Sequence, residues 1–272
     1  MESVLAEARA LIEGGVKELI VIAQDITRYG TDLNGEHQLA KLLKELCKLD
    51  FHWIRLHYLY PTDTTDELID VIASEPKIVK YLDIPIQHIN DDILRRMNRR
   101  GNGEYVKELF AKLRREIPGL VLRTSLITGL PGEGEAEFAQ LCDFLKEYKL
   151  ERVGAFAFSP EEGTRAAEME YPDTEIARQR ADMVAEIQSR IMDDYNESCI
   201  GKTMQVLCEG YDPDEESYYG RTFADSPDID GKIWFTAEKH IKTGDFADVR
   251  VVDAYDGELV GVLEEEYNDD CE

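Results

Sequence analysis

The feature that most constrains the fold is a regular alternation of strand-like and helical patterns over the first 160 residues. Five runs rich in β-branched and aromatic residues are separated by segments whose apolar residues recur at helical spacing. The strand-like runs cover residues 18–25, 53–61, 81–88, 120–131 and 152–160. Such alternation is typical of βαβ units, so the sequence predicts an α/β fold whose parallel sheet is closed or partly closed as a barrel.

The helical segments are amphipathic, and some carry end signals. In residues 38–49, four leucines share one face, at positions 39, 42, 43 and 46. Thr64 and Glu67 form a predicted capping box ahead of residues 65–74, and Asn90 is placed to cap a short helix. Further helices are predicted over residues 3–13, 103–117 and 135–148. Because the pattern begins with a helix, we expect a strand to precede it in a longer chain.

After residue 172 the pattern changes twice. Residues 173–198 form one long helical stretch with a single apolar face. Short β-like runs then follow at residues 203–209, 218–223, 231–235 and 248–254, separated by turn residues. These runs predict a small all-β domain of the five-stranded barrel kind. We therefore expect an α/β barrel over residues 1–165, a linking helix over 166–198 and a β-barrel over 199–272.

The chain is strongly acidic, and the excess charge is concentrated near its end. Its 57 Asp plus Glu outnumber 31 Lys plus Arg, for a net charge of −26. Residues 199–272 hold 6 basic and 20 acidic residues, a net charge of −14. Phosphates would be repelled, so the charge disfavours nucleic acid as a partner, whereas it suits a basic protein.

Five cysteines lie far apart, at positions 47, 142, 199, 208 and 271. An odd, scattered set argues against a disulfide framework and for a reducing, cytoplasmic setting, and no two are spaced as a metal-binding pair. No run of about 18 apolar residues occurs, and no basic start precedes an apolar stretch. We therefore expect neither a membrane span nor a signal peptide.

Polar residues follow the first two predicted strands, where parallel α/β barrels place their chemistry. Gln24 and Asp25 offer an amide oxygen and a carboxylate to a ligand's amino group, and an ordinary capped turn is an equal alternative. On the second strand, Arg55 and His57 share one side. Because both are costly to bury unpaired, they predict a polar lumen, or a face that meets solvent at the helix ends.

The third and fourth strands also end in polar or flexible residues. Gln87 and His88 close the third strand, and we favour a hydrogen-bonded turn histidine over a proton carrier. Gly129 and Gly132 let the backbone approach a ligand closely, and Glu133 suits the start of a helix. The spacing matches neither a phosphate loop nor a dinucleotide fingerprint, so the pattern alone does not indicate a reaction.

Taken together, the strand-end motifs resemble the methylthiotransferases of the radical S-adenosylmethionine superfamily. The resemblance runs in one order from near residue 2 to about residue 263 and is strongest to the RimO type. That type methylthiolates an aspartate of the twelfth small-subunit ribosomal protein, whereas the sister MiaB type modifies an adenosine near the tRNA anticodon. The matching residues are Ala23-Gln24-Asp25, Tyr29-Gly30, residues 81–88, Met97-Asn98-Arg99 and residues 122–133.

The resemblance implies S-adenosylmethionine and two 4Fe-4S clusters in the full-length enzyme. One cluster belongs to an N-terminal domain and one to a Cys-x-x-x-Cys-x-x-Cys loop of the radical domain, while a C-terminal TRAM domain, at the position of residues 199–272, binds substrate. It implies that Gln24 and Asp25 bind the methionine amino group and that Gln87 lies near the sulfonium. The residues implied for the carboxylate, ribose and adenine are Arg123, Thr124, Ser125, Ile127 and Gly129.

The chain departs from the family in one respect, because no Cys-x-x-x-Cys-x-x-Cys occurs in it. We therefore interpret it as a fragment that begins after the cluster loop, inactive by itself and unable to hold a cluster stably. Its expected partner is the basic ribosomal protein. Two alternatives remain open, a MiaB-type tRNA enzyme and a non-enzymatic acidic binding protein, and the six basic residues of 199–272 disfavour the first.

Overall fold

The computed structural model describes residues 1–267. The chain forms two compact units, of which the first covers residues 1–188 and the second starts at Ser189. The division falls inside the long helix α8 (Thr174–Glu197). The domain limits at residues 165 and 198 stay predictions.

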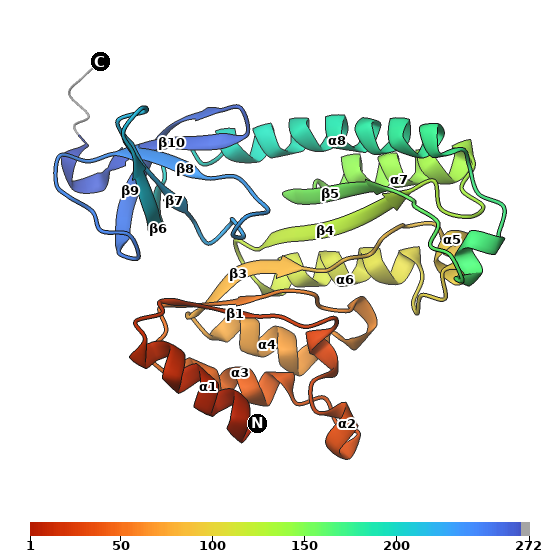
Figure 1. Cartoon of the computed structure of the whole chain (residues 1–272), viewed down its shortest axis with the longest axis horizontal. Coiled ribbons are helices and arrows are strands. Elements are labelled where there is room, and N and C mark those ends of the chain that lie inside the picture. The colour runs from red at the N-terminus through yellow and green to blue at the C-terminus, as the bar shows by residue number, and fades with distance from the viewer. Residues whose placement is uncertain (268–272) are drawn as a thin grey trace. The chain divides into compact units, whose positions relative to one another are not determined.

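The first unit is built on one parallel sheet, which confirms the α/β prediction. Within residues 1–267 its strands are paired in sequence order, β1-β2-β3-β4-β5, and every pairing is parallel (Figure 1). The strands are β1 (Glu18–Val21), β2 (Trp53–Leu56), β3 (Ile78–Asp83), β4 (Val121–Thr128) and β5 (Arg152–Ala157). Each is shorter than its sequence pattern, because the polar residues after the apolar run leave the sheet and form the strand-end loops.

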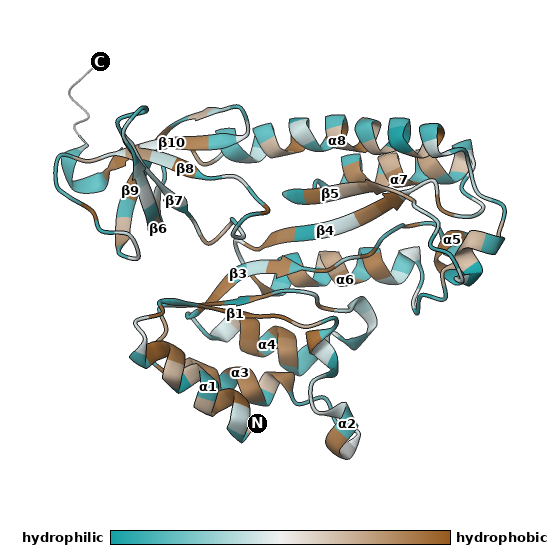
Figure 2. Ribbon diagram, in the orientation of Figure 1, coloured by the Kyte–Doolittle hydropathy of each residue, from teal (hydrophilic) through white to brown (hydrophobic). Residues whose placement is uncertain are grey.

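Helices connect the strands and bury their apolar sides. They are α1 (Glu2–Glu13), α2 (Thr31–Asn34), α3 (Leu39–Cys47), α4 (Asp66–Ser74), α5 (Asp91–Arg96), α6 (Gly103–Glu116), α7 (Glu135–Tyr148) and α8. Figure 2 shows apolar stretches beside hydrophilic ones in α1, α3 and α4, as amphipathic helices require. All four leucines of the predicted face of α3 are buried.

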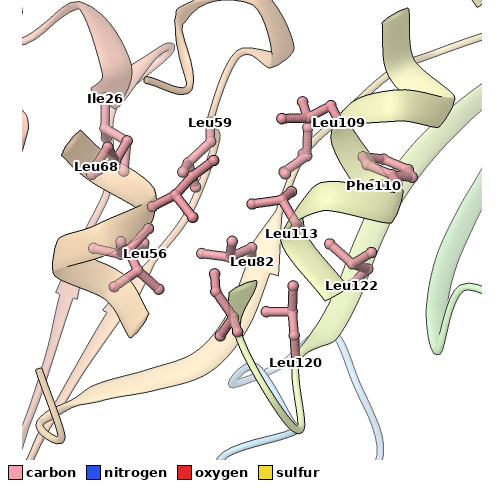
Figure 3. Close-up of a cluster of buried hydrophobic side chains, with 14 of the residues drawn as sticks. Ile26, Leu56, Leu59, Leu68, Leu82, Leu109, Phe110, Leu113, Leu120 and Leu122 are labelled. Carbon is pink, nitrogen blue, oxygen red and sulfur yellow. The ribbon is translucent and has the colours of Figure 1, made fainter. Parts of the chain in front are cut away.

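The core of this unit lies between the sheet and the helices that pack on one of its faces. Figure 3 shows Leu56, Leu82 and Leu122, from three neighbouring strands, beside Leu68 of α4 and Leu113 of α6. All five side chains are at most 3% exposed. Because side chains alternate between the faces of a strand, the residues next to these leucines lie on the opposite face of the sheet.

Two predicted helix caps have different outcomes. Asn90 caps α5 as expected, and its Oδ1 accepts hydrogen bonds from the backbone N–H groups of Asp92 and Ile93 at 3.0 and 3.1 Å. The capping box of Thr64 was wrong by one residue. Thr65 caps α4 by accepting from the N–H of Leu68, while the Thr64 hydroxyl donates to the Tyr60 carbonyl.

The second unit is a closed β-barrel, which confirms the predicted five-stranded barrel. In the described part of the chain its strands follow the order β10-β8-β7-β6-β9. They are β6 (Thr203–Asp212), β7 (Ser217–Arg221), β8 (Ile233–Thr236), β9 (Phe246–Tyr255) and β10 (Glu258–Leu263). The sequence patterns located the first four and missed β10. Val206, Phe235 and Val249 fill its interior.

A helix that spans a bilayer needs about 20 predominantly apolar residues. Among residues 1–267, no helix is both long enough and apolar enough to cross a membrane.

Candidate functional site

The face of the parallel sheet opposite the leucine core carries charged residues. Arg55 is fully buried, and its Nε donates to Oε1 of Glu18 over 2.7 Å. Its guanidinium carbon lies 4.9 Å from the ring centroid of Tyr81, and the His57 ring lies 6.0 Å from the same centroid. Both Arg55 and His57 are buried and partnered, as a polar lumen requires, rather than exposed at the helix ends. We call this surface the polar face, and it comprises Glu18, Arg55, Asp83, Arg123 and Ser125.

A second buried ion pair lies on the polar face. Nη1 of Arg123 donates to Oδ1 of Asp83 over 2.8 Å, and the Asp83 residue is 2% exposed. The same nitrogen lies 3.4 Å from the hydroxyl of Ser125. Arg123 is therefore held in place by the protein, and a ligand carboxylate at this position would share the guanidinium with Asp83.

The residues predicted on β4 divide between the two faces of the sheet. Ser125 and Ile127 alternate with the core leucines and are half-buried on the side of Arg123. The Thr124 hydroxyl lies on the other side, where it donates to the Ile84 carbonyl and accepts from the Ile86 N–H, at 2.8 and 3.1 Å. Thr124 thus stabilises the segment around Pro85, and its hydroxyl is engaged away from the polar face.

Gln24 and Asp25 follow β1 directly. Oδ1 of Asp25 accepts hydrogen bonds from both the backbone N–H and the hydroxyl of Thr27, and Asp25 thereby caps the short 3-10 helix Ile26–Arg28. The capped turn is therefore present at Asp25 and engages Oδ1 of its carboxylate. Gln24 is exposed.

Gln87 follows β3 with an unusual backbone. Its φ of +66° lies in the left-handed region, which costs free energy for a residue with a side chain. Two hydrogen bonds to β4 hold it there. Its N–H donates to the Ser125 carbonyl and its carbonyl accepts from the Ile127 N–H, at 2.9 and 2.8 Å. The structure therefore brings together three predicted residues from the ends of two strands.

The strand register places these residues toward the carboxyl ends of their strands. Val21, Leu56, Leu82 and Leu122 are aligned in one row across four strands. The residues Gln24, Asp25, Gln87, Arg123, Ser125, Ile127 and Gly129 all follow that row along their strands or the loops after them. They lie toward the carboxyl ends, where open parallel sheets bind ligands.

Gly129 has a packing reason to be glycine. Its φ is +75°, and a Cβ at this position would lie 2.3 Å from the Cβ of Ala177 in α8. Its N–H donates to Oε1 of Glu133 over 2.9 Å. The missing side chain of Gly129 therefore makes room for Ala177 of the same protein. The Gly129 N–H also helps to hold Glu133, which is part of a buried cluster.

That buried cluster also contains His88, which the sequence suggested was a turn histidine. Nδ1 of His88 accepts the backbone N–H of Asn90 at 3.0 Å, so it carries no proton. In the neutral ring the hydrogen is therefore on Nε2, which lies 3.3 Å from Oε2 of Glu133. Both side chains are fully buried, and these two atoms are close to each other without hydrogen-bond geometry.

Arg180 completes the cluster, and the sequence analysis missed it. Its Nη1 donates to Oε1 and to the carbonyl of Glu133, at 2.9 and 3.0 Å, and its Nη2 donates to Glu135 at 2.7 Å. Burial lowers the pKa of Arg180, but the hydrogen bonds to Glu135 and Glu133 outweigh it, and the net pKa is raised. Arg180 lies 47 residues after Glu133 on a helix rich in exposed charges, so no local pattern marks it.

The described cysteines do not fit an iron-sulfur cluster. Cys142, Cys199 and Cys208 are buried and Cys47 is half-buried, and none of these four is in a disulfide bond. Burial raises the thiol pKa of Cys142 and Cys208, and raises that of Cys47, with Glu75, to about 11. Cluster ligands are thiolates. Over residues 1–267, no three His, Cys, Asp or Glu side chains are grouped to hold a metal ion.

Comparison with curated proteins gives close relatives over nearly the whole chain. The ribosomal protein uS12 methylthiotransferase RimO of Lachnoclostridium phytofermentans is 47% identical over 97% of this chain and 60% of its own length. The protein of the same name from Geobacter sulfurreducens is 47% identical over 97% of this chain and 59% of its own length. The chain therefore spans about three fifths of the length of these relatives.

Family profiles and solved structures agree with both units of the fold. A TRAM domain profile matches residues 200–263, which include the closed barrel. Coproporphyrinogen III oxidase (HemN) from Escherichia coli, described as a radical SAM enzyme, superposes with a TM-score of 0.52 at 18% identity, over 65% of this chain and 41% of that one. The radical SAM superfamily profile matches residues 1–145, which is more than half of the 272 residues, so the chain belongs to the radical SAM superfamily.

Proposed function

We propose that this chain is the cofactor-binding and substrate-binding part of a ribosomal protein methylthiotransferase of the RimO type. The observation that carries the proposal is the 47% identity to curated enzymes of that name, which extends over 97% of the chain and includes both units. The reaction replaces a hydrogen on the Cβ of an aspartate in the twelfth small-subunit ribosomal protein by a methylthio group. Ribosomal proteins are modified in the cytoplasm, so we expect the chain there.

The geometry supports a cofactor site at the carboxyl side of the polar face. Gln24 is exposed after β1, while Gln87, Ser125 and Ile127 are half-buried and adjacent. We assign these residues, with Asp25 and Arg123, to S-adenosylmethionine. The cofactor's amino group needs acceptors and its carboxylate needs donors, and the site offers both. Thr124 and Gly129 contribute through the backbone, because the hydroxyl of Thr124 faces the other side and Gly129 packs on Ala177.

We expect this chain by itself to bind no iron-sulfur cluster. We predict that the protein, given iron and sulfide under anaerobic conditions, holds no stoichiometric 4Fe-4S cluster, because its described thiols are dispersed and buried. Iron and sulfide analysis and the visible absorption spectrum measure this directly. A stable cluster at one equivalent would contradict the interpretation that this chain is a partial enzyme.

The proposed activity is tested by joining this chain to the part of a relative that it does not match. The segment of the Lachnoclostridium phytofermentans relative that this chain does not match, which the family resemblance implies to be N-terminal, is fused ahead of Met1 and the clusters are reconstituted. We expect mass spectrometry to show a methylthio group on the ribosomal protein in the presence of S-adenosylmethionine. Modification of tRNA in its place would establish the MiaB-type alternative. Modification of neither substrate by a cluster-loaded fusion would favour a non-enzymatic binding protein.

The barrel of the second unit offers an acidic surface for a basic substrate. Asp214, Glu215, Glu216 and Asp228 are exposed. Other acidic side chains of the same loops form hydrogen bonds within the barrel. Asp225 is buried and accepts from the Thr222 hydroxyl at 2.6 Å, and Asp212 and Asp230 accept from backbone N–H groups. Fewer carboxylates are therefore available to a substrate than the composition suggests.

We predict that the full chain binds the basic ribosomal protein more tightly than tRNA. Exposed charges are screened over roughly 8–10 Å at physiological ionic strength, so binding is expected to weaken as salt rises, mainly through a slower on-rate. Titrations at several salt concentrations measure both affinities. The matched control replaces Asp214 and Glu215 by Asn and Gln, which is expected to reduce the salt dependence. Equal or tighter binding of tRNA would reject the RimO-type assignment.

A further inference from the structure

A group of arginines lies at the carboxyl ends of the sheet strands, in a chain whose net charge is −26. Residues 95–100 contain four arginines, two at the end of α5 and two in the loop that follows it. The Arg96 guanidinium lies on the loop after β4, where a Cβ at Gly132 would be 2.8 Å from its Cζ. Figure 1 shows α5 on the side of the sheet toward which the β4 arrow points. These cations therefore lie against the strand-end loops from which the proposed cofactor site is built.

Arg99 is held in place by two of these loops. Its Nη2 donates to the Pro85 carbonyl, after β3, over 2.5 Å. Its guanidinium carbon lies 5.0 Å from the ring centroid of Tyr60, after β2, and the residue is half-buried. A side chain that is already fixed at two points loses little conformational freedom when it binds a ligand, so Arg99 is preorganised.

The charge of Arg99 is not balanced by a carboxylate of the described chain. The Tyr60 ring also carries the guanidinium of Arg100, at 5.1 Å, and Arg100 pairs with Asp63 at 2.7 Å. Over residues 1–267, no acidic side chain forms an ion pair with Arg99. Burial lowers the pKa of the Arg99 guanidinium, as expected for a cation that is partly removed from water without an anion beside it. Two cations thus share one carboxylate, and an anionic ligand would balance the second.

The guanidinium of Arg99 still has N–H groups to offer to a ligand. Within the described residues only its Nη2 donates a hydrogen bond, while Nε and Nη1 have no acceptor and keep surface that solvent reaches. A guanidinium carries five N–H donors on two edges, and Pro85 uses one hydrogen of Nη2. One complete edge therefore remains, and its fork of parallel N–H groups matches the two oxygens of a carboxylate.

We propose that Arg99 binds the side-chain carboxylate of the aspartate that the enzyme modifies. The proposal rests on the proposed function for the identity of the substrate. In aspartate the carboxylate carbon is bonded directly to Cβ, so a guanidinium that holds the carboxylate also positions the carbon that loses a hydrogen. Pro85, which fixes Arg99, precedes Gln87 by two residues, and Gln87 is assigned above to the cofactor. One loop would then position both reactants.

A double-mutant cycle on the full chain tests this contact. The native chain and its Arg99→Gln variant are each titrated with the ribosomal protein and with a form of it whose modified aspartate is replaced by asparagine. We expect the asparagine form to bind the native chain about tenfold more weakly, as for the loss of a hydrogen bond to a charged group. The two forms are expected to bind Arg99→Gln within about twofold of each other.

Two results of this cycle would overturn the proposal. Equal affinity of the native chain for the two forms would overturn it without any variant. A tenfold difference that persists in Arg99→Gln would show that another group reads the aspartate. A purely structural role of Arg99 gives this second result, because a structural defect weakens both forms of the ribosomal protein by the same factor.

Arg95 provides the matched control. It is an exposed arginine of the same helix and pairs with Asp92 at the surface. Arg95→Gln removes the same charge four residues away and is expected to preserve the tenfold difference between the two forms of the ribosomal protein. Loss of that difference in Arg95→Gln as well would show that only the general charge of residues 95–100 matters, and would contradict a specific contact with Arg99.

Two other anions are distinguished by the same variant. In the cluster-loaded fusion, Arg99→Gln is expected to leave the affinity for S-adenosylmethionine unchanged. Weaker binding of S-adenosylmethionine would assign Arg99 to the cofactor's own carboxylate and overturn the proposal. An Arg99→Gln chain that loses affinity for tRNA, while it binds both forms of the ribosomal protein as the native chain does, would assign Arg99 to a phosphate and overturn it too.

The binding cycle needs neither clusters nor catalysis, so it separates this contact from the proposed function. A fusion that modifies the ribosomal protein, together with equal affinity of the native chain for the two forms, would reject the Arg99 contact alone. An aspartate-dependent affinity that Arg99→Gln abolishes, although the fusion modifies no ribosomal protein, would support the contact and reject the proposed function.

Discussion

Replacing Arg55 by Ala is expected to lower the free energy of unfolding by about 3–5 kcal/mol, because it leaves the Glu18 carboxylate buried without its guanidinium partner. The pair is fully inside the protein, with side chains 0% and 5% exposed and the donor and acceptor 2.7 Å apart. The variant also removes the contact between the guanidinium and the Tyr81 ring. Urea denaturation of the full chain, followed by circular dichroism, measures the change.

A double variant separates the ion pair from the space that it fills. Glu18→Leu with Arg55→Met replaces both charges by apolar groups of similar length, and such replacements are often neutral or stabilising. We expect its stability to lie within about 1 kcal/mol of the native chain. An Arg55→Ala variant as stable as the native chain would show that the polar face admits enough water to solvate Glu18.

Replacing Glu133 by Gln is expected to destabilise the chain by about 3 kcal/mol, because the charge of buried Arg180 then lacks its buried partner. The substitution keeps the size of the side chain and an oxygen that can accept from the Gly129 N–H. Oε1 of Glu133 lies 2.9 Å from Nη1 of Arg180, and the Glu133 side chain is fully buried. The loss in the free energy of unfolding therefore measures mainly the removal of the Glu133 charge. Thermal and urea denaturation measure the loss.

Glu135 provides a matched control on the same guanidinium. It pairs with Nη2 of Arg180 at 2.7 Å, but its side chain is 91% exposed. Exposed ion pairs contribute little because water screens them, so Glu135→Gln is expected to leave the unfolding midpoint nearly unchanged. If both variants lose equal stability, burial does not govern the strength of this cluster.

The local elements were predictable because they depend on periodicity within one segment. The alternation of apolar runs and amphipathic stretches predicted the parallel sheet, and the leucine face of α3 is buried as expected. Short-range caps were nearly as predictable, since Asn90 and the α5 N–H groups are separated by two or three residues. The cap of α4 was placed one residue early because Thr64 and Thr65 are equally suited in sequence, and only the chain direction after the loop decides between them.

The strand β10 was missed for a similar reason. Its pattern is short, Gly261 interrupts the apolar residues, and three glutamates follow it. A run of this kind becomes a strand because it can pair on both sides. It is parallel to β8 and antiparallel to β9, and these two pairings close the barrel.

The sequence by itself determined the α/β character of the first unit, the barrel in the second and the strand ends where polar residues gather. Only the tertiary structure decided which of those residues are engaged within the protein. Asp83 and Arg123 are 40 residues apart, Glu133 and Arg180 are 47 apart, and Asn196 reaches Gly257 over 61 residues. Contacts of this kind have no local signal, because they exist only after the strands have been ordered and the helices packed. A buried charge is stable only where the fold brings its partner within hydrogen-bond distance, and the fold alone determines that position.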